Sequence, residues 1–335
     1  MTEYGRTNEG EAASSWQRSV FYHLLVSGGT ERRINLAAGE GADYTQLKEF
    51  QADGYTDYVA FVHRFASAGV IGEMDAFYVQ FITRSDGGFA EEHLAALRAL
   101  VPPLALSIKC ASLGRIAGTL AEVYLGRDAG RRVLSGRIAR GVADRIGAVL
   151  WFSDLRGYTT ISDSAEPEEI IPLLTDYAAV VISAIHEAGG DVLKLVGDGT
   201  LAIFTDPGDG NAAACHAALH AERLLRERLA LLNEARGAAG RPVTAAYLGL
   251  HVGEVFYGNI GSEERLDFTV VGPSVNEVSR IASMCRSVDR HLLVSSDFLT
   301  AAPKEDRAGF VSVGRFALRG VGRAQELYTL DPALL

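Results

Sequence analysis

The chain has 335 residues, enough for two or three ordinary domains with a sizeable core. Apolar residues make up 48% and charged residues 22%, as in globular proteins, and the net charge of −10 disfavours nucleic acid, which usually meets a basic surface. Three irregularly spaced cysteines, Cys110, Cys215 and Cys285, indicate neither a disulfide framework nor a zinc knuckle, and they favour a reducing, cytoplasmic setting.

The sequence predicts neither a secretory leader nor a membrane span. Residues 1–19 are polar and lack a basic segment followed by an apolar one. The most apolar stretch, residues 94–113, contains Arg98, the pair Pro102-Pro103 and Lys109, which a membrane-spanning helix would rarely carry.

The first third of the chain carries mixed signals. We expect a domain over residues 1–115, with a strand at 77–82, a glycine turn at 85–89 and a helix over 90–109 that Pro102-Pro103 interrupts. Residues 116–143 read as a helical linker with apolar positions among arginines, although several glycines argue against one unbroken helix.

Residues 144–335 predict an α+β domain, one sheet covered by helices. The apolar run 148–152 is a buried strand, and a helix begins at Asp163 or Ser164 and stops at Gly189-Gly190. Two strand-like runs flank Gly197-Asp198-Gly199 and predict a tight hairpin. Further along the chain we expect helices over 211–236 and 274–286, and strands near 243–252, 267–272, 291–296, 310–319 and 325–330.

Two aspartates stand where chemistry is often placed. Asp154 follows the buried strand and opens Asp-Leu-Arg-Gly-Tyr-Thr, while Asp198 has glycine on both sides. Each alone is more often a cap or turn residue. Brought together, two carboxylates can hold divalent cations against a triphosphate, and a helix starting near Gly157 would offer free amides to phosphates.

Four ordered blocks make a resemblance clear. Three of them are Phe-Ser-Asp-Leu-Arg-Gly-Tyr-Thr at 152–159, Lys-Leu-Val-Gly-Asp-Gly at 194–199 and Asp-Phe-Thr-Val-Val-Gly-Pro-Ser-Val-Asn-Glu-Val-Ser-Arg at 267–280. The fourth is the glycine-rich block 249–261. Together they are similar to the signature blocks of class III adenylate and guanylate cyclases. The resemblance implies a ferredoxin-like cyclase domain over 144–335. Residues 1–115 resemble a GAF sensor domain, or alternatively a PAS-type domain.

The resemblance also implies a role for each matching residue. Two divalent metal ions, Mg²⁺ or Mn²⁺, would be held by Asp154, the Leu155 carbonyl and Asp198. Lys194 and Thr269 would read the purine, Asn276 would orient the ribose, and Arg280 would stabilise charge on the α-phosphate. Thr159 and Arg319 would meet the triphosphate, and Arg265 is a further phosphate candidate. His251 is expected to be structural rather than catalytic.

The pairing of Lys194 with Thr269 resembles the Lys/Thr subgroup of bacterial adenylate cyclases, which implies conversion of ATP to 3′,5′-cyclic AMP and pyrophosphate. Guanylate cyclases usually carry an acidic residue where Lys194 stands. A guanylate cyclase and a catalytically silent scaffold remain the alternatives. In the non-functional alternative, Lys194 is an ordinary exposed lysine on a strand. Asn276 and Arg280, four residues apart, then lie together on a solvated helix face.

Finally, the resemblance implies a homodimer that acts in signal transduction. In the family the metal aspartates of one subunit work with the purine and transition-state residues of the other, so a chain with one cyclase domain would pair around a twofold axis. The linker would form a short coiled coil or pack on its own domain, and the N-terminal part would respond to an unidentified small molecule or protein.

Overall fold

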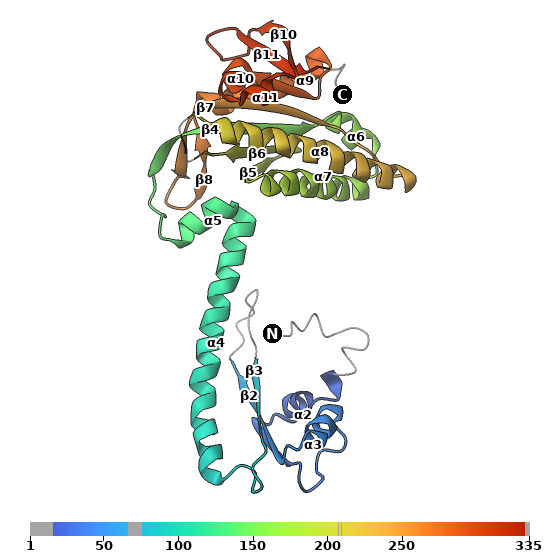
Figure 1. The fold of residues 1–335 in the computed structure, drawn as a ribbon, viewed down its shortest axis with the longest axis vertical. Helices are drawn as coiled ribbons and strands as arrows, with labels where there is room; N and C mark the ends of the chain where they lie inside the picture. Colours follow the sequence, from blue (N-terminus) through green and yellow to red (C-terminus); the bar gives the residue numbers. More distant parts are fainter. Residues whose placement is uncertain (1–15, 66–75, 207, 209, 332–335) are drawn as a thin grey trace. The chain divides into compact units, whose positions relative to one another are not determined.

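A computed structural model describes residues 16–65, 76–206, 208 and 210–331. The chain divides into two compact units, Met1–Ala117 and Gly118–Leu335 (Figure 1). The expectation that the chain starts without a leader rests mostly on residues 1–15, which lie outside the described residues.

The described part of the N-terminal unit contains an antiparallel sheet of three strands in the order β1-β2-β3. Its elements are α2 (Val20–Ser27), β1 (Glu31–Asn35), α3 (Thr45–Ala52), β2 (Asp57–Arg64) and β3 (Ala76–Thr83). The central strand β2 alternates its side chains, so Tyr58 packs with α2 and α3 while Val59 packs on the other face with Leu94 and Val101. A three-stranded meander is common to many α+β domains, so the GAF-like assignment stays a prediction.

The helix α4 (Glu91–Leu125) is longer than the sequence suggested. The prediction that Pro102-Pro103 interrupts it is wrong, because both prolines lie inside one continuous helix. Each proline removes a backbone donor, but buried residues on both sides of the pair, among them Leu94 and Ala105, anchor the helix through tertiary packing.

The C-terminal unit is built on one sheet, with eight strands among the described residues. The strands run in the order β10-β11-β9-β7-β4-β6-β5, with β8 paired to β7, and every pairing is antiparallel except β7 with β9. The strands are β4 (Ala143–Leu155), β5 (Asp191–Val196), β6 (Gly199–Phe204), β7 (Ala246–Gly261), β8 (Leu266–Val271), β9 (Leu292–Ser295), β10 (Phe310–Phe316) and β11 (Gln325–Leu330).

Helices cover both faces of this sheet (Figure 1). Along β4 the period-two alternation sends Trp151 into the core beneath α7 and α8, and Leu150 into the core on the opposite face. Both side chains are fully buried. The helices are α5 (Arg127–Leu134), α6 (Tyr158–Ser164), α7 (Pro167–Glu187), α8 (Ala212–Ala238), α9 (Pro273–Val288), α10 (Ser296–Ala301) and α11 (Lys304–Arg307).

Most predicted elements of this unit are present, with two shifts near the candidate site. The helix expected from Asp163 or Ser164 is instead two helices, α6 and then α7, which starts at Pro167 with Glu166 as its N-cap. Proline is pre-organised for the first helical turn, which explains the later start. The strand expected at 243–252 continues to Gly261, because its far end pairs with β8.

Among the described residues, two helices are long and apolar enough to cross a membrane, by length and composition only, so the expectation of no membrane span stays a prediction. They are α4 and α7. In α7 the apolar residues Tyr177, Val181 and Ile185 are buried in the core of the C-terminal unit. A buried core helix meets the same criteria as a spanning one, so length and composition do not decide between them.

Candidate active site

The structure brings Asp154 and Asp198 together. Asp154 is the penultimate residue of β4, and Asp198 lies in the turn between β5 and β6. Strand β6 pairs directly with β4, with Thr200 opposite Ser153, so the turn is carried to the end of β4. The two carboxyl groups are close enough to share a hydrogen bond. The pair predicted from sequence therefore exists within one chain.

Glycines make the turn possible. Gly197 has φ +63°, in the left-handed region that L side chains rarely adopt. A Cβ at Gly199 would lie 3.2 Å from the backbone oxygen of Ser153, so only glycine lets β6 approach β4 here without displacement. Asp198 is held between these two glycines, which fixes the direction of the chain at the turn.

The electrostatics of the pair suit a cation. Burial, followed by the hydrogen bond and charge of Asp198, raises the pKa of Asp154 to about 7. Two half-buried carboxylates side by side repel each other, and a divalent cation relieves that repulsion while accepting oxygen ligands. No group of three or more His, Cys, Asp or Glu side chains with metal-binding geometry occurs among the described residues. The fit to metal therefore rests on this pair of carboxyl groups.

The two residues predicted to read a purine lie on contacting strands. Lys194 is on β5 and Thr269 is on β8, and these strands touch. Lys194 Nζ lies 2.5 Å from Asp267 Oδ2. Thr269 is 6% exposed, and its Oγ1 is buried without a hydrogen-bond partner among the described residues. A buried hydroxyl without a partner is costly, so this one is free to serve a ligand.

Asn276 and Arg280 are both exposed on α9. They lie one turn apart on the outer side of the helix, while Val278 and Ile281 are buried beneath it. Neither side chain makes a hydrogen bond or ion pair with any residue in the part of the chain that the structure describes. The structure thus keeps these groups together and available.

Of the remaining predicted residues, Thr159, Arg265 and Arg319 are exposed and Leu155 is buried. Thr159 is the second residue of α6, a helix whose N-cap is Gly157; the φ of +74° at Gly157 turns the chain out of β4. Leu155 is buried at the end of β4. Arg319 and Arg265 are exposed in the loops before β11 and before β8.

Sequence reasoning missed one residue of this site. Asp267 lies inside the quoted block but received no role, although it stands two residues before Thr269 and so shares a strand face with it. The two-residue spacing from Thr269 was the sequence feature that could have identified Asp267. The ion pair with Lys194 depends on the approach of β5 to β8, which the sequence alone does not reveal.

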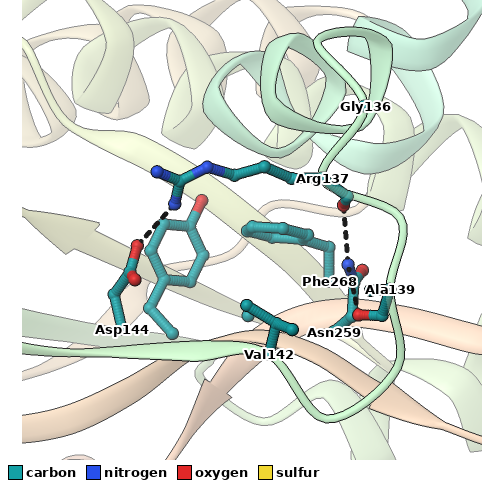
Figure 2. A pocket seen from close by; sticks show the side chains of 9 residues that line it. Gly136, Arg137, Ala139, Val142, Asp144, Asn259 and Phe268 are labelled. Atoms are coloured by element: carbon teal, nitrogen blue, oxygen red, sulfur yellow. Dashed lines mark hydrogen bonds and ion pairs between the residues drawn. The ribbon is translucent and has the colours of Figure 1, made fainter.

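A separate cavity of about 230 Å³ lies where the segment after α5 meets β7 and β8 (Figure 2). Asn259 donates from Nδ2 to the backbone oxygens of Arg137, at 2.7 Å, and Ala139, at 3.4 Å. Arg137 in turn lies 2.7 Å from Asp144. These contacts tie the end of the predicted linker to the sheet, at a place distinct from the carboxylate pair.

The C-terminal unit is similar in sequence to known proteins. The sequence model of the family "Adenylate and Guanylate cyclase catalytic domain" matches residues 143–331. An adenylate cyclase of Anabaena cylindrica is 37% identical over 159 residues, 46% of this chain and 30% of that protein. Adenylate cyclase 1 of Rhizobium meliloti is 29% identical over 210 residues, 62% of this chain and 31% of that protein. The chain spans about a third of the length of these curated relatives.

Solved structures agree with the fold. The crystal structure of the adenylyl cyclase CyaB from P. aeruginosa aligns with a TM-score of 0.51 at 26% identity, covering 57% of this chain and 96% of that chain. A bacterial light-regulated adenylyl cyclase aligns with a TM-score of 0.58 at 21% identity, over 69% of this chain and 65% of that one, which supports the fold alone. The family match covers more than half of the chain and includes every residue of the candidate site. The chain therefore belongs to the adenylate and guanylate cyclase catalytic domain family.

Proposed function

We propose that this protein is an adenylate cyclase that converts ATP to 3′,5′-cyclic AMP and pyrophosphate at sites shared by two copies of the chain. The observation that carries the proposal is the close pairing of Asp154 with Asp198 in a chain that also exposes Asn276 and Arg280 on α9. The first pair suits metal and triphosphate, and the second suits ribose and the developing charge.

A second copy of the chain is the partner that the site needs. The apolar residues Leu195, Phe256, Leu266 and Val271 lie on β5, β7 and β8 and are 37% to 53% exposed. Phe256 and Val271 are a cross-strand pair, and Val271 shares a strand face with Asp267 and Thr269, so an exposed apolar patch lies beside Thr269, as at many interfaces. In a twofold dimer the patch would be covered, and the carboxylate pair of one copy would face α9 of the other.

The chain's residues account for the reaction as follows. Bound between Asp154 and Asp198, two divalent metals would lower the pKa of the ribose 3′-hydroxyl and neutralise charge on the phosphates. Asn276 would hold the ribose so that the 3′-oxygen faces the α-phosphorus. Arg280 would stabilise the charge that develops there as the bond to pyrophosphate breaks. Thr159 and Arg319 would hold the outer phosphates.

The choice of ATP follows from hydrogen-bond polarity. The Lys194 ammonium can only donate, which suits N1 of adenine, an acceptor, and opposes N1 of guanine, which carries a proton. The unpartnered Thr269 hydroxyl can accept from the adenine amino group. The guanylate cyclase alternative would require Lys194 to leave this position. A silent scaffold would be expected to lack an aspartate, Asn276 or Arg280, and all are present.

Regulation by the N-terminal unit is part of the proposal. The supporting feature is α4, a single helix that begins among the core residues of the first unit and ends at Leu125, within the second. A helix shared by two units can transmit a change in one to the other.

The proposal is tested by incubating the purified chain with Mn²⁺ or Mg²⁺ and either ATP or GTP, and identifying the cyclic product. Cyclic AMP from ATP is expected, with no product from Asp154→Ala. The double variant Lys194→Glu with Thr269→Cys should lose ATP turnover, and Lys304→Glu, at an exposed position on α11, serves as a charge-matched control. Cyclic GMP as the main product, or unchanged ATP turnover in the double variant, would contradict the assignment.

A further inference from the structure

A buried polar chain underlies the helix that carries Asn276 and Arg280. His251, on β7, is 3% exposed. Its Nδ1 lies 2.8 Å from Ser295 Oγ, and its Nε2 lies 3.2 Å from Glu277 Oε2 on α9. The side chain of Glu277 is 19% exposed. A charged residue this well covered requires a reason for its burial.

The chain extends to a third element. Gln325, the first residue of β11, donates from Nε2 to the same oxygen of Glu277 at 2.6 Å. Gln325 is 5% exposed. Directly before it runs the loop that carries Arg319. One carboxylate of α9 is therefore bonded both to β7 and to the strand that follows this loop.

The donors fix where the protons lie. The backbone N–H of Phe298 donates to Ser295 Oγ at 3.1 Å, which leaves the serine hydroxyl to donate to His251 Nδ1. We therefore assign the imidazole proton to Nε2, where it donates to the Glu277 carboxylate. Glu277 then accepts two hydrogen bonds in its ionised form, and the bond from His251 is the main cause of its lowered pKa.

Two glycines allow α9 to lie this close to β7. Gly249, His251 and Gly253 share one face of the strand, because alternate residues point the same way. A Cβ at Gly249 would lie 2.7 Å from the backbone nitrogen of Ala282, and one at Gly253 would lie 2.7 Å from Ser274 Cβ. The backbone of α9 thus lies directly on Gly249 and the side chain of Ser274 lies on Gly253, while His251 is the side chain of this row that reaches into the helix.

We propose that His251 and Glu277 are positioning residues that set the rotation of α9 on the sheet and hold it in register with the Arg319 loop. The inference rests on the proposed function. Glu277 follows Asn276 directly, and each helical residue turns the chain by about 100°. Fixing the direction of Glu277 therefore fixes the directions in which Asn276 and Arg280 point. Gln325 bonds to the same carboxylate and so holds the Arg319 loop in place relative to α9.

A purely structural network would add stability without any special effect on catalysis. The two roles are separated by comparing Glu277→Leu with Glu222→Leu in the full-length protein. Glu222 is also a covered carboxylate in an ion pair, 2.7 Å from Arg226, but it lies on α8. Both substitutions should lower the melting temperature.

Only Glu277→Leu should lower kcat for cyclic AMP formation, by on the order of 10- to 100-fold, because small misplacements of reacting groups carry penalties of this size. KM for ATP should change less than kcat, since the base and metal residues lie on other elements and only the Arg319 contact with the phosphates is tied to Glu277. Glu277→Gln keeps an oxygen that accepts from His251 Nε2, and it should recover most of the lost kcat. Equal kcat in Glu277→Leu and Glu222→Leu, after correction for the folded fraction, would overturn the proposal.

Failure of the proposed function would be recognised separately. If the wild-type chain makes no cyclic nucleotide, hydrogen exchange still tests the network. Glu277→Leu should then speed exchange of the amides in α9 and in residues 317–324, and Glu222→Leu should not. Unchanged exchange in both segments would end the positioning proposal, whatever the activity of the protein.

Discussion

At the scale of single residues, the site combines groups with matched and unmatched charges. Lys194 has a carboxylate partner in Asp267, while Asp154 has a neighbour of its own sign in Asp198. The first contact orients a donor and leaves it charged. The second makes a charged state unfavourable until a cation arrives. Each arrangement has a measurable consequence.

Removing the partner of Lys194 should weaken base selection. In Asp267→Asn the ammonium loses the contact that holds its direction, so the ratio of kcat/KM for ATP over GTP should fall, by roughly three- to tenfold. Stability should change little, since the two side chains are 34% and 55% exposed and such pairs contribute about 0–1 kcal/mol.

The matched control is Glu254→Gln, which breaks an exposed ion pair with Arg145 on the same sheet. It should leave the ATP to GTP ratio unchanged. An equal fall in both variants would show that Asp267 has no particular role in base selection.

The carboxylate pair should make the metal-free protein less stable as the pH rises. The pKa of Asp154 is raised in the folded state from 3.8 to about 7, so between these values the folded chain binds more protons than the unfolded chain, and stability falls with increasing pH. Above about pH 7 Asp154 is ionised in the folded chain, and the full loss of folding stability applies. Asp154→Asn removes it, so with chelator present its melting temperature should exceed that of wild type at about pH 8 more than at about pH 5.

Two further measurements complete this test. Asp163→Asn, at an exposed position on α6, removes the same formal charge and should show no such dependence. Mn²⁺ should raise the melting temperature of the wild type more than that of Asp154→Asn. A difference between wild type and Asp154→Asn that is the same at both pH values would contradict the prediction.

At the scale of elements, close backbone packing decides where functional side chains point. Gly249 sits beneath α9, where an added Cβ would meet backbone atoms of Ala282 and Val278 at 2.7 Å and 2.8 Å. Backbone cannot rotate away as a side chain can, so the helix itself would have to move. The placement of Asn276 thus depends on a residue that has no side chain.

Gly249→Ala should therefore destabilise the C-terminal unit by about 1–3 kcal/mol, the usual penalty for overpacking, and lower activity as α9 shifts. Urea unfolding of the full-length chain measures the first effect, and product formation measures the second. Gly147→Ala on β4 is the control, because its Cβ would come no closer than 3.4 Å to the side chain of Asn211. Equal unfolding free energies in the two variants would refute the packing argument.

Much of the element structure can be predicted from the sequence, because the patterns that indicate it lie within short segments of the chain. The alternation around Trp151, the Gly197-Asp198-Gly199 hairpin and the position of α9 all follow from residues adjacent in the chain. Other features depend on contacts between distant segments. The continuity of α4 through its prolines needs the buried contacts of Leu94 and Ala105, and the length of β7 needs its pairing with β8. The role of Glu277 could not be found from sequence, because His251 and Gln325 are far from it along the chain.

At the scale of the whole molecule, the proposed shared site predicts that two inactive variants can restore activity when mixed, provided that their substitutions lie in different halves of the site. A mixture of Asp154→Ala and Asn276→Ala chains should form heterodimers with one intact site. With random pairing, the mixture should recover roughly a quarter of wild-type activity, since half of the dimers are mixed and each has one of two sites.

A mixture of Asp154→Ala with Asp198→Ala provides the control. Both changes fall in the same half, so no combination of these chains restores a site. Recovery in the control, or no recovery in the first mixture although heterodimers are detected, would rule out shared sites.

The break between α4 and α5 has a practical consequence for engineering. Gly126 has φ +91°, and a Cβ there would lie 2.6 Å from the carbonyl oxygen of Val192, where β5 is bulged, two residues before Lys194. The joint between α4 and α5 thus packs against β5, the strand that carries Lys194. A chimera that replaces the N-terminal unit should be fused upstream of this glycine, since a crossover downstream would also remove the contact between Gly126 and β5.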